Sequence, residues 1–311
     1  MKITVIVPTY RRPNDLGRCL EALKGQERPA DQVLVTVRED DSETNAFLEG
    51  YDAATLPLQI VRLAVPGVLA AMSAGVAQTS GDIVALTDDD TAPYPDWLMR
   101  IEAHFAADPA VGGVGGRDWQ ANDHRSRLIV GKIQWHGRVA GNHHLGVGEA
   151  REVDVLKGAN CAYRAEPLKE IGFESRLRGN GAQVHWELAL GMAMKRAGWK
   201  LIYDPAVAMD HFIAQRFDED VNHRGYFNAA GLTNSAYNET LVLLTYLPPL
   251  RRAVFLAWAF LLGTWSEPGP LQVPRLLARR DCNAWNRLRA TFAGRTGAMN
   301  TAFRAKQSGA K

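Results

Sequence analysis

The stretch Ile83-Val84-Ala85-Leu86-Thr87-Asp88-Asp89-Asp90 is an apolar run of strand length that ends in three carboxylates. Apolar residues without alternation are typical of a strand buried on both faces of an α/β sheet. The acids would then lie at the carboxyl end of the strand, where open α/β sheets bind ligands. Because adjacent carboxylates repel one another, the stretch predicts a bound divalent cation, a hard ion that prefers oxygen ligands. The alternative is a solvated acidic turn after a strand.

Strands and helices alternate on either side of this stretch. Apolar runs predict strands over residues 3–7, 32–37, 59–63 and 83–87. Helical spacing of apolar residues predicts helices over residues 14–24, 68–79, about 95–107 and 186–197. This order predicts an α/β fold with a mostly parallel central sheet and helices on both faces. Between Gly115 and Gly158 the pattern is lost, and we expect a long connection there.

Length and composition are those of an ordinary globular protein. The 311 residues are 46% hydrophobic and 23% charged, which allows one large domain or two small ones. Cys19, Cys161 and Cys282 lack metal-site or CxxC spacing, which indicates a reducing compartment without a disulfide framework. The apolar stretch over residues 3–7 is too short for a secretory signal, so we expect a cytoplasmic protein.

The net charge of +2 conceals an asymmetry along the chain. Residues 251–311 contain eleven Lys and Arg against two acids, a net +9, which leaves −7 on residues 1–250. This split predicts an acidic body with a basic tail that meets an anionic surface. We expect no nucleic acid as partner, because no recognisable binding module accompanies the basic residues.

The segment 240–265 is rich in apolar residues, but Pro248-Pro249-Leu250-Arg251-Arg252 interrupts it. The apolar run that follows, residues 253–262, is well short of the roughly 20 residues needed to span hydrocarbon. Apolar residues flanked by arginines and tryptophans favour peripheral contact with an anionic membrane, here the inner face of the cell membrane. The alternative is a helix hairpin that packs on the body or joins two protomers into a homo-oligomer.

Five segments carry the motifs of a known family in the correct order. They are residues 5–12, 65–90 with the continuation 93–98, 157–164, 186–188, and Asp204-Pro205 followed by His211. Together they resemble the family 2 inverting glycosyltransferases, which have the GT-A fold, a Rossmann-like arrangement with a mostly parallel sheet. The resemblance covers residues 1–212, and residues 88–90 stand where the family has its DXD motif.

The resemblance implies transfer of a sugar from a nucleotide-diphosphate donor to a glycan, polysaccharide or lipid-linked acceptor. Transfer would be a single displacement with Mg²⁺ or Mn²⁺ as cofactor. The catalytic domain would cover residues 1–235, with a nucleotide-binding half over 1–116 and an acceptor-binding half over 117–235. Residues 236–311 would form a C-terminal helical, apolar and basic extension. Two alternatives stay open: a nucleotidyltransferase on the same type of sheet, and a non-catalytic binding or scaffold protein.

The resemblance assigns the metal to Asp90 and His211. Asp90 would bind the cation, which also contacts the donor diphosphate, and His211 would complete the metal shell or contact the diphosphate. Asp88 and Asp89 would bind the nucleotide sugar, with Asp88 beside the ribose or supporting the metal through water. The alternative for His211 is a half-buried histidine that follows a strand.

The resemblance places the nucleotide at Pro8, Thr9, Tyr10, Arg12 and Asp40. Thr9 would contact the base through its backbone, Arg12 would reach a phosphate, and Asp40 would accept a hydrogen bond from the base. The alternative is an ordinary polar loop. One departure from the family leaves the donor open, because its Arg-Asn pair is Met72-Ser73 here.

Glu187 is the expected catalytic base. It stands at the start of the predicted helix 186–197, where the helix dipole favours an ionised carboxylate. The family more often has Asp here, preceded by Glu, whereas this chain has Trp186-Glu187. The alternative is a surface glutamate in the first turn of a helix.

Overall fold

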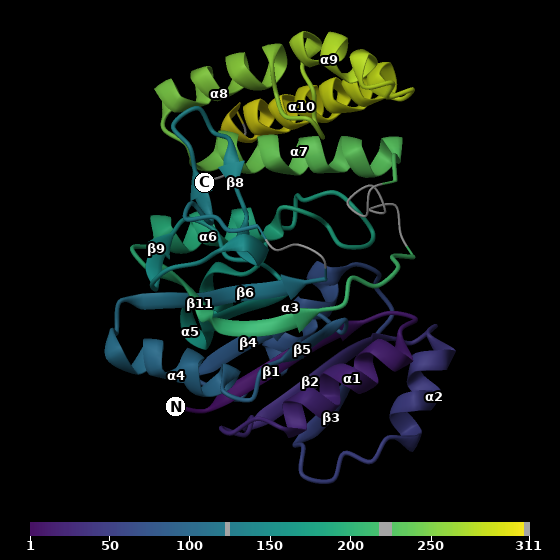
Figure 1. The fold of residues 1–311 in the computed structure, drawn as a ribbon, viewed down its shortest axis with the longest axis vertical. Helices are drawn as coiled ribbons and strands as arrows, with labels where there is room; N and C mark the ends of the chain where they lie inside the picture. The colour runs from purple at the N-terminus through teal and green to yellow at the C-terminus, as the bar shows by residue number, and fades with distance from the viewer. Residues whose placement is uncertain (122–124, 218–225, 308–311) are drawn as a thin grey trace. The chain divides into compact units, whose positions relative to one another are not determined.

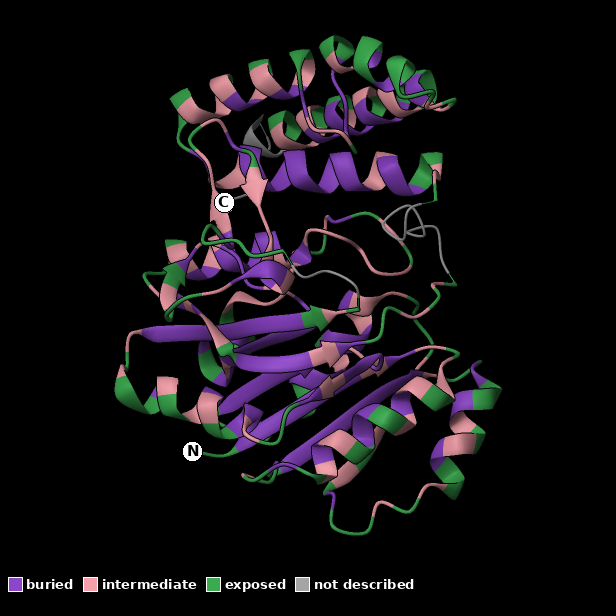
Figure 2. Cartoon of the chain, in the orientation of Figure 1, coloured by how far each residue is buried: buried purple, intermediate pink, exposed green. Residues whose placement is uncertain are grey.

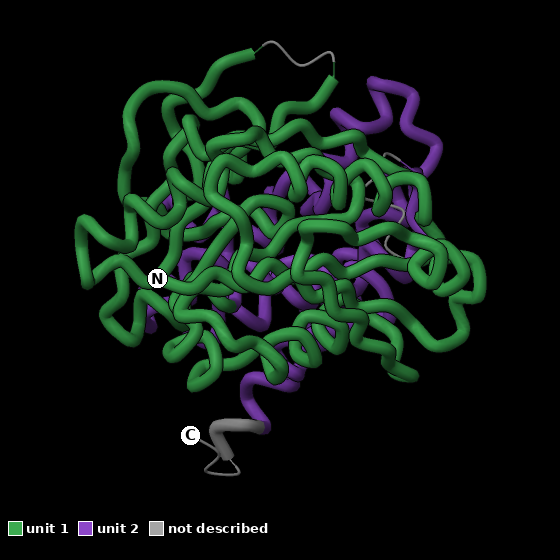
Figure 3. The backbone as a smooth tube through the Cα atoms, turned by 90° about the horizontal axis from the view of Figure 1, so that it is seen from below, with its two compact units in different colours: residues 1–132, 140–173, 190–214 green, residues 133–139, 174–189, 215–311 purple. Residues whose placement is uncertain are grey.

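The computed structural model describes residues 1–121, 125–217 and 226–307. The chain divides into two compact units, which Figure 3 shows in different colours. Unit 1 consists of residues 1–132, 140–173 and 190–214, and unit 2 consists of residues 133–139, 174–189 and 215–311.

Unit 1 is built on one nine-stranded sheet, visible in Figure 1. Its strands are β1 (Ile3–Thr9), β2 (Gln32–Arg38), β3 (Leu58–Leu63), β4 (Ile83–Thr87), β5 (Thr91–Pro93), β6 (Val111–Gln120), β9 (Arg151–Val153), β10 (Asn160–Arg164) and β11 (Lys200–His211). They lie in the order β3-β2-β1-β4-β10-β6-β11-β5, with β9 also paired to β11. β1, β2, β3 and β4 are parallel, β11 is parallel to β6, and β10 runs antiparallel between β4 and β6. The predicted α/β fold with a mostly parallel sheet is confirmed.

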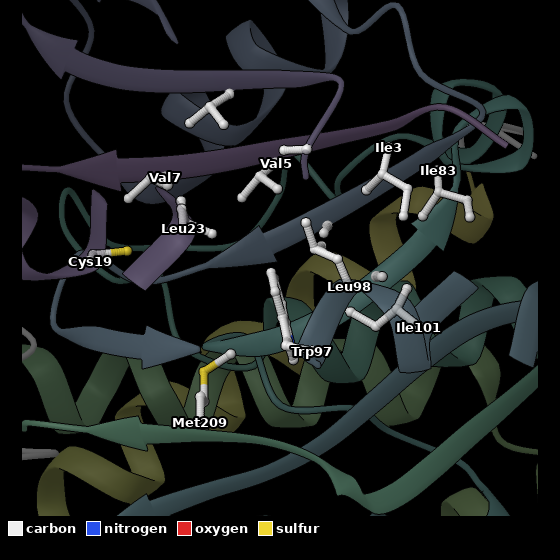
Figure 4. Packing of buried hydrophobic residues seen from close by; sticks show 14 of the residues in the cluster. Ile3, Val5, Val7, Cys19, Leu23, Ile83, Trp97, Leu98, Ile101 and Met209 are labelled. Atoms are coloured by element: carbon white, nitrogen blue, oxygen red, sulfur yellow. The ribbon is translucent and has the colours of Figure 1, made fainter. Parts of the chain in front are cut away.

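Helices cover both faces of this sheet. They include α1 (Pro13–Lys24), α2 (Ser42–Gly50), α3 (Val68–Gln78), α4 (Trp97–Ala107) and α5 (Ala165–Ile171). On one face, Leu23 of α1 and Trp97 of α4 join Val5 in the buried cluster of Figure 4. On the other face, a Cβ added to Gly75 of α3 would lie 2.8 Å from the Cγ2 of Ile6. Successive residues of a strand point to opposite faces, so Val5 and Ile6 show that both faces are covered, as predicted.

β4 confirms the strand predicted over residues 83–87. All five of its residues are buried, and it lies between β1 and β10 in the interior of the sheet. A strand in this position has no face for polar side chains, which explains its unbroken apolar sequence. Residues 88–90 therefore follow directly from a rigid, central element of the fold.

The long connection expected over residues 115–158 is wrong for its first part, which is a strand. β6 has eight buried residues in succession, and its glycines allow two close approaches. A Cβ on Gly113 would lie 2.7 Å from the Cδ2 of Leu201, and one on Gly116 would lie 1.7 Å from the carbonyl oxygen of Val207. Val111 and Val114 are the only β-branched residues of β6, and four glycines break any apolar run or alternation, so the sequence pattern could not reveal this strand.

The rest of that connection carries short elements. They are β7 (Lys132–Ile133), β8 (Val139–Ala140) and the 3-10 helix η1 (His143–Leu145), followed by β9. The buried guanidinium of Arg117 donates from Nε to the carbonyl oxygen of His144 at 3.0 Å. The imidazole of His143 is buried and lies 2.9 Å from the carbonyl oxygen of Val155. Buried polar side chains therefore hold the part of the connection that belongs to unit 1.

The C-terminal part of unit 2 is helical. It contains α7 (Ala229–Tyr246), α8 (Pro249–Leu261), the 3-10 helix η3 (Pro270–Gln272), α9 (Val273–Ala278) and α10 (Ala284–Gln307). α7 is buried over most of its length (Figure 2). It approaches α10 closely, because a Cβ on Gly294 would lie 2.3 Å from the carbonyl oxygen of Thr233. The domain boundary predicted after residue 235 falls inside α7, and the division of the catalytic domain into two halves stays a prediction.

The apolar run over residues 253–262 lies mostly within α8, which has 13 residues. Among the described residues, no helix combines the length and the apolar composition that a membrane span requires.

Candidate active site

Several side chains singled out in the sequence meet at one edge of the unit 1 sheet. β1, β4, β6 and β11 point in the same direction, so their carboxyl ends lie at the same edge. Thr9 ends β1, residues 88–90 follow β4, and His211 ends β11. This is the edge where open α/β sheets bind ligands.

Asp89 holds the loop after β1 against the end of β4. Its buried carboxylate accepts a hydrogen bond from the Thr9 hydroxyl at 2.8 Å and another from Arg12 NH1 at 2.8 Å. Burial raises the pKa of Asp89 to about 7, with Asp90 adding to the rise and Arg12 opposing it. The structure therefore engages Asp89 in contacts within the protein, and its predicted role in binding the nucleotide sugar stays a prediction.

Asp88, Asp90 and His211 form a group that could hold a metal ion. One ligand atom from each of them lies within 4.8 Å of the others. Asp90 is fully buried, and its Oδ2 accepts a hydrogen bond from the backbone N–H of Ala214 at 2.9 Å. The Nε2 atom of His211 lies 3.3 Å from the Oδ1 atom of Asp90. The end of β11 thus supplies His211, and the segment that follows it fixes Asp90 through the N–H of Ala214.

Asp118 is a member of this site that the sequence did not reveal. It lies near the end of β6, is fully buried, and has its Oδ2 atom 3.0 Å from His211 Nδ1. A carboxylate only accepts hydrogen bonds, so Nδ1 carries the proton and Nε2 is the atom that faces Asp90. Asp118 could have been found from the pairing of β6 with β11, because the parallel register places it beside Met209, two residues before His211. That register could be used only once β6 was recognised as a strand.

The charges of this site explain the protonation of His211. Burial lowers the pKa of His211, but the carboxylates of Asp118 and Asp90 outweigh burial and raise it to about 9. Burial raises the pKa of Asp90, but His211 and the N–H of Ala214 outweigh burial and bring it below its usual range. The site therefore favours a positive charge between two carboxylates. A metal ion competes with a proton for Nε2, so a divalent cation can supply this charge instead.

Tyr10 is enclosed by arginines at the end of β1. The guanidinium carbon of Arg11 lies 5.1 Å from the centre of its ring, and that of Arg38 lies 4.7 Å from it. Pro8 is half-buried and pairs with Thr36 of β2 in the parallel register. The residues predicted to contact the nucleotide base therefore lie at the ends of two neighbouring strands.

Two of the three acids after β2, Asp40 and Asp41, have different surroundings. Asp40 is exposed, with a side-chain exposure of 56%, and forms an ion pair with Arg38. Asp41 is buried, accepts from the backbone N–H of Arg11 at 2.6 Å, and caps α2 by accepting from the N–H of Thr44 at 3.1 Å. Asp41 is thus a structural residue, and the role of Asp40 toward the base stays a prediction.

Glu187 lies in the first turn of α6 (Trp186–Arg196), as the sequence predicted. It belongs to unit 2, whereas Asp90 and His211 belong to unit 1. Two other carboxylates of the matched region, Asp154 and Glu174, form ion pairs. Asp154 Oδ1 lies 2.6 Å from the Nζ of Lys195, and Glu174 Oε2 lies 2.6 Å from Arg176 NH2. The role of Glu187 as the base stays a prediction.

Comparison with known families decides the class of protein. The profile of the family described as "Glycosyltransferase like family 2" matches residues 1–226. The chain belongs to this family. The match includes all ten residues assigned above to the metal, the nucleotide sugar and the base. The alternative of a nucleotidyltransferase is therefore not supported.

Curated relatives of this glycosyltransferase have related names. The chain is 22% identical over 221 residues to a glucosyl-dolichyl phosphate glucuronosyltransferase of Haloferax volcanii, covering 68% of this chain and 69% of the relative. It is 31% identical over 197 residues to glycosyltransferase AglE of the same organism, covering 59% of each chain. An N-acetylglucosaminyltransferase of Sinorhizobium fredii is 24% identical over 266 residues, 80% of this chain and 61% of the relative.

Solved structures share the fold of this glycosyltransferase. A mannosyltransferase of Pyrobaculum calidifontis, in complex with GDP-Man and Mn²⁺, has a TM-score of 0.57 and 19% identity, covering 100% of this chain and 88% of its own. S. aureus TarS residues 1–349, in complex with UDP-GlcNAc, has a TM-score of 0.60 and 16% identity, covering 99% of this chain and 92% of its own. At these identities the likeness concerns the fold, and it confirms the GT-A architecture.

The donor set of this glycosyltransferase fits a divalent metal ion. Carboxylate oxygens from Asp88 and Asp90 and an imidazole nitrogen from His211 are ligands suited to Mg²⁺ or Mn²⁺. The Nε2 atom of His211 is buried and forms no hydrogen bond of good geometry among the described residues, although Asp90 Oδ1 lies 3.3 Å from it. A buried polar atom without a partner is costly, so its presence here supports a ligand position. The Asp118 carboxylate accepts a hydrogen bond from His211 Nδ1 and so orients the imidazole with Nε2 toward the other two residues.

Proposed function

We propose that this glycosyltransferase moves a sugar from a nucleoside-diphosphate donor to an acceptor hydroxyl with inversion at the anomeric carbon. The observation that carries the proposal is the group Asp88, Asp90 and His211 at the carboxyl edge of the sheet. These residues would hold Mg²⁺ or Mn²⁺. When bound, the cation supplies positive charge that stabilises the departing diphosphate.

The protein's own residues orient and neutralise the donor. Arg12 NH1 lies 2.8 Å from Asp89 Oδ1 and 3.7 Å from Asp90 Oδ2, so it brings a fixed positive charge to the same edge. Thr9 and Tyr10 continue this edge from the end of β1, and Asp40 follows β2. In this proposal Pro8, Thr9, Tyr10 and Asp40 bind the nucleoside. Because the family Arg-Asn pair is absent, Arg12 and the cation carry the charge of the diphosphate.

Glu187 is the proposed base for the acceptor. The acceptor oxygen forms a bond to the anomeric carbon while the bond from that carbon to the diphosphate oxygen breaks. The hydroxyl proton passes to the carboxylate of Glu187, and the nucleoside diphosphate leaves. The position of Glu187 in the first turn of α6 favours its ionised form through the helix dipole. A base that is ionised before the reaction is ready to accept the proton.

Relatives and neighbours support the proposed donor and acceptor classes. The solved neighbours hold GDP-Man or UDP-GlcNAc, and one relative is named for a dolichyl phosphate-linked glucose. We therefore propose a UDP- or GDP-sugar as donor and a lipid-linked or polysaccharide glycan as acceptor. The matched region covers 59% of one relative and 61% of another, so their whole activities are not transferred to this chain.

Peripheral contact with an anionic membrane is the proposed setting of the reaction, on the cytoplasmic face. Unit 2 exposes large apolar side chains, with exposures of 68% for Leu250, 64% for Leu271 and 57% for Trp285. Arg279 and Arg280 are exposed in the same unit, on the short loop that follows α9. Apolar side chains combined with arginines suit the interface of a membrane with anionic lipid. Homo-oligomerisation stays the alternative use of these residues.

The deciding experiment combines nucleotide binding with donor hydrolysis. Calorimetry with UDP and with GDP should show binding only when Mn²⁺ or Mg²⁺ is present. A panel of UDP- and GDP-sugars should then reveal at least one whose hydrolysis releases the nucleoside diphosphate. Asp90→Ala should abolish metal-dependent binding and nearly all turnover, because the diphosphate charge is no longer neutralised. Unchanged Mn²⁺-dependent affinity in Asp90→Ala would end the assignment of Asp90 to the metal.

A further inference from the structure

The segment that leads into α6 has an unusual backbone. Residues with positive φ follow one another closely: Gly179 at 122°, Gln183 at 43° and His185 at 72°. Residues other than glycine rarely adopt positive φ, and they keep such a conformation only where the surrounding structure holds them. Glu187 follows two residues after the last of them. The position of the proposed base therefore depends on what holds this segment.

Asn238 of α7 ties the two ends of the segment together. Its side chain is fully buried, and its Oδ1 atom accepts from the backbone N–H of Arg178 at 2.7 Å. Its Nδ2 atom donates to the carbonyl oxygen of Arg178 at 2.9 Å and to that of Val184 at 3.0 Å. One side chain thus makes three hydrogen bonds to the backbone on both sides of the segment. The guanidinium of Arg178 also stacks on the ring of Tyr237, 3.7 Å from its centre.

Ser235, one turn earlier on α7, holds the next residue of the segment. Its hydroxyl donates to Glu267 Oε1 at 2.5 Å, and His185 Nε2 lies 3.0 Å from the same hydroxyl oxygen. A hydroxyl has one hydrogen to donate, so the contact with His185 is one in which the imidazole N–H donates to Ser235. Both Ser235 and Glu267 are buried. The chain of hydrogen bonds fixes the imidazole two residues before Glu187.

Glu267 is itself anchored from α10. The NH2 atom of Arg295 donates to the carbonyl oxygen of Glu267 at 3.1 Å and lies 3.9 Å from its Oε2 atom. Arg295 is fully buried and also donates from NH1 to the carbonyl oxygen of Ala259. The contacts therefore run from α10 through Glu267 and α7 to the segment before α6. All of these residues belong to unit 2.

We infer that α7 positions Glu187, with Asn238 and Ser235 as the positioning residues. This inference rests on the proposed role of Glu187 as the base. It assigns a part in the reaction to a helix that begins after the region matched by the family profile, which ends at residue 226. Neither residue touches the reacting atoms; they act by holding the backbone on the N-terminal side of Glu187. A small displacement of a base from its working geometry can reduce a rate about 100-fold, so this support has a measurable consequence.

Ser235→Ala and Asn238→Ala test the inference in the full chain, with Thr233→Ala as the matched control. Thr233 lies on the same helix, but its hydroxyl donates to the carbonyl oxygen of Ala229 within α7. We expect the hydrolysis of the active UDP- or GDP-sugar at saturating donor to fall about 10-fold in Ser235→Ala and about 100-fold in Asn238→Ala. Mn²⁺-dependent affinity for UDP or GDP should stay within twofold of the parent, since unit 1 supplies the metal and nucleotide residues. Thr233→Ala should behave as the parent.

Hydrogen exchange supplies a readout that does not depend on catalysis. Amides of residues 178–187 should exchange faster than in the parent in Ser235→Ala and Asn238→Ala, and at the parent rate in Thr233→Ala. Amides of β1 and β4 should keep their protection in all three variants. Faster exchange with slower hydrolysis and unchanged nucleotide affinity supports the inference. If Glu187→Gln is slow but both α7 variants hydrolyse donor at the parent rate, the positioning role of α7 is overturned. If Glu187→Gln itself hydrolyses donor at the parent rate, the role of the base fails, and the inference falls with it.

Discussion

Replacement of Asp118 by asparagine should weaken Mn²⁺ binding while leaving the fold intact. Asp118 is fully buried on β6 and accepts the Nδ1 proton of His211 at 3.0 Å. Asparagine has nearly the same shape, and its amide oxygen can accept the same proton, but it carries no charge. Without the carboxylate, the imidazole becomes a poorer donor of electrons at Nε2 and its orientation is less firmly fixed. The metal is therefore affected through His211, although Asp118 is not itself assigned as a ligand.

The structure indicates the size of this effect. Loss of the outer partner of a metal-bound histidine weakens metal binding about 10- to 100-fold. Lys157 Nζ lies 3.4 Å from Asp118 Oδ2, and in the variant its positive charge is no longer balanced there. The lost negative charge and the unbalanced lysine both oppose a cation. We therefore expect the upper half of the range, about 30- to 100-fold, or about 2 to 2.8 kcal/mol in binding free energy.

Calorimetric titration with Mn²⁺, with paramagnetic resonance of free Mn²⁺ as a second measurement, checks this value. Asp108→Asn is the matched control, because it makes the same change in unit 1 at a carboxylate that pairs with Lys200 at 2.9 Å. The control should bind Mn²⁺ as the parent does. A folded Asp118→Asn variant whose Mn²⁺ affinity stays within twofold of the parent would refute the reasoning.

Three further predictions concern the base, the membrane and a buried acid. Glu187→Gln should slow transfer by about 10²- to 10⁴-fold at saturating donor while calorimetry shows unchanged donor affinity; transfer within a few-fold of the parent would exclude it as the base. Replacing Arg279 and Arg280 together by Gln should reduce partition onto phosphatidylglycerol vesicles at low salt by about 1 kcal/mol per arginine, and equal partition would favour packing on protein instead. Burial, together with the charge of Glu267, raises the pKa of Glu239 from 4.5 to about 8. The folded chain thus binds this proton more tightly than the unfolded chain, so the free energy of unfolding should fall by up to about 1.4 kcal/mol per pH unit as the pH rises from 4.5 to about 8. Urea melts of Glu239→Gln should lack this pH dependence, and an unchanged pH dependence would exclude Glu239 as its source.

The sequence predicted those elements whose apolar pattern arises directly from burial against the core. β4 is buried on both faces, so its apolar run had the same limits in sequence and structure. α1 has one buried face that includes Leu16 and Leu20, and its helical spacing was equally clear. In such elements local pattern and tertiary burial agree, which is the condition for reading structure from sequence. That Asp88, Asp90 and His211 lie together could be predicted because they stand at the ends of these well-marked strands or in family motifs.

Other elements were missed because tertiary packing determines them. β6 was not recognised because its glycines are set by close neighbours such as Val207, and Asp118 was missed with it. The predicted helical extension from residue 236 covered only part of α7, which has buried residues on all sides, including Asn238 and Ser235, and lacks the apolar stripe by which a surface helix is recognised. The contacts of Asn238 join positions 60 apart in the sequence. No local pattern carries such information.

The arrangement of the proposed metal group bears on how the protein is made in the cell. The hydrogen bond from the N–H of Ala214 to Asp90 Oδ2 joins positions 124 apart in the sequence, and His211 stands at the end of the last strand of the sheet. A nascent chain that has left the ribosome only as far as β10 contains Asp88 and Asp90. It lacks the imidazole of His211 and the backbone N–H of Ala214 that fixes Asp90. The complete set of proposed metal ligands therefore exists only after β11 has been synthesised. We therefore expect scarcity of manganese or magnesium during translation to act on the completed unit, in which Asp88, Asp90 and His211 are together.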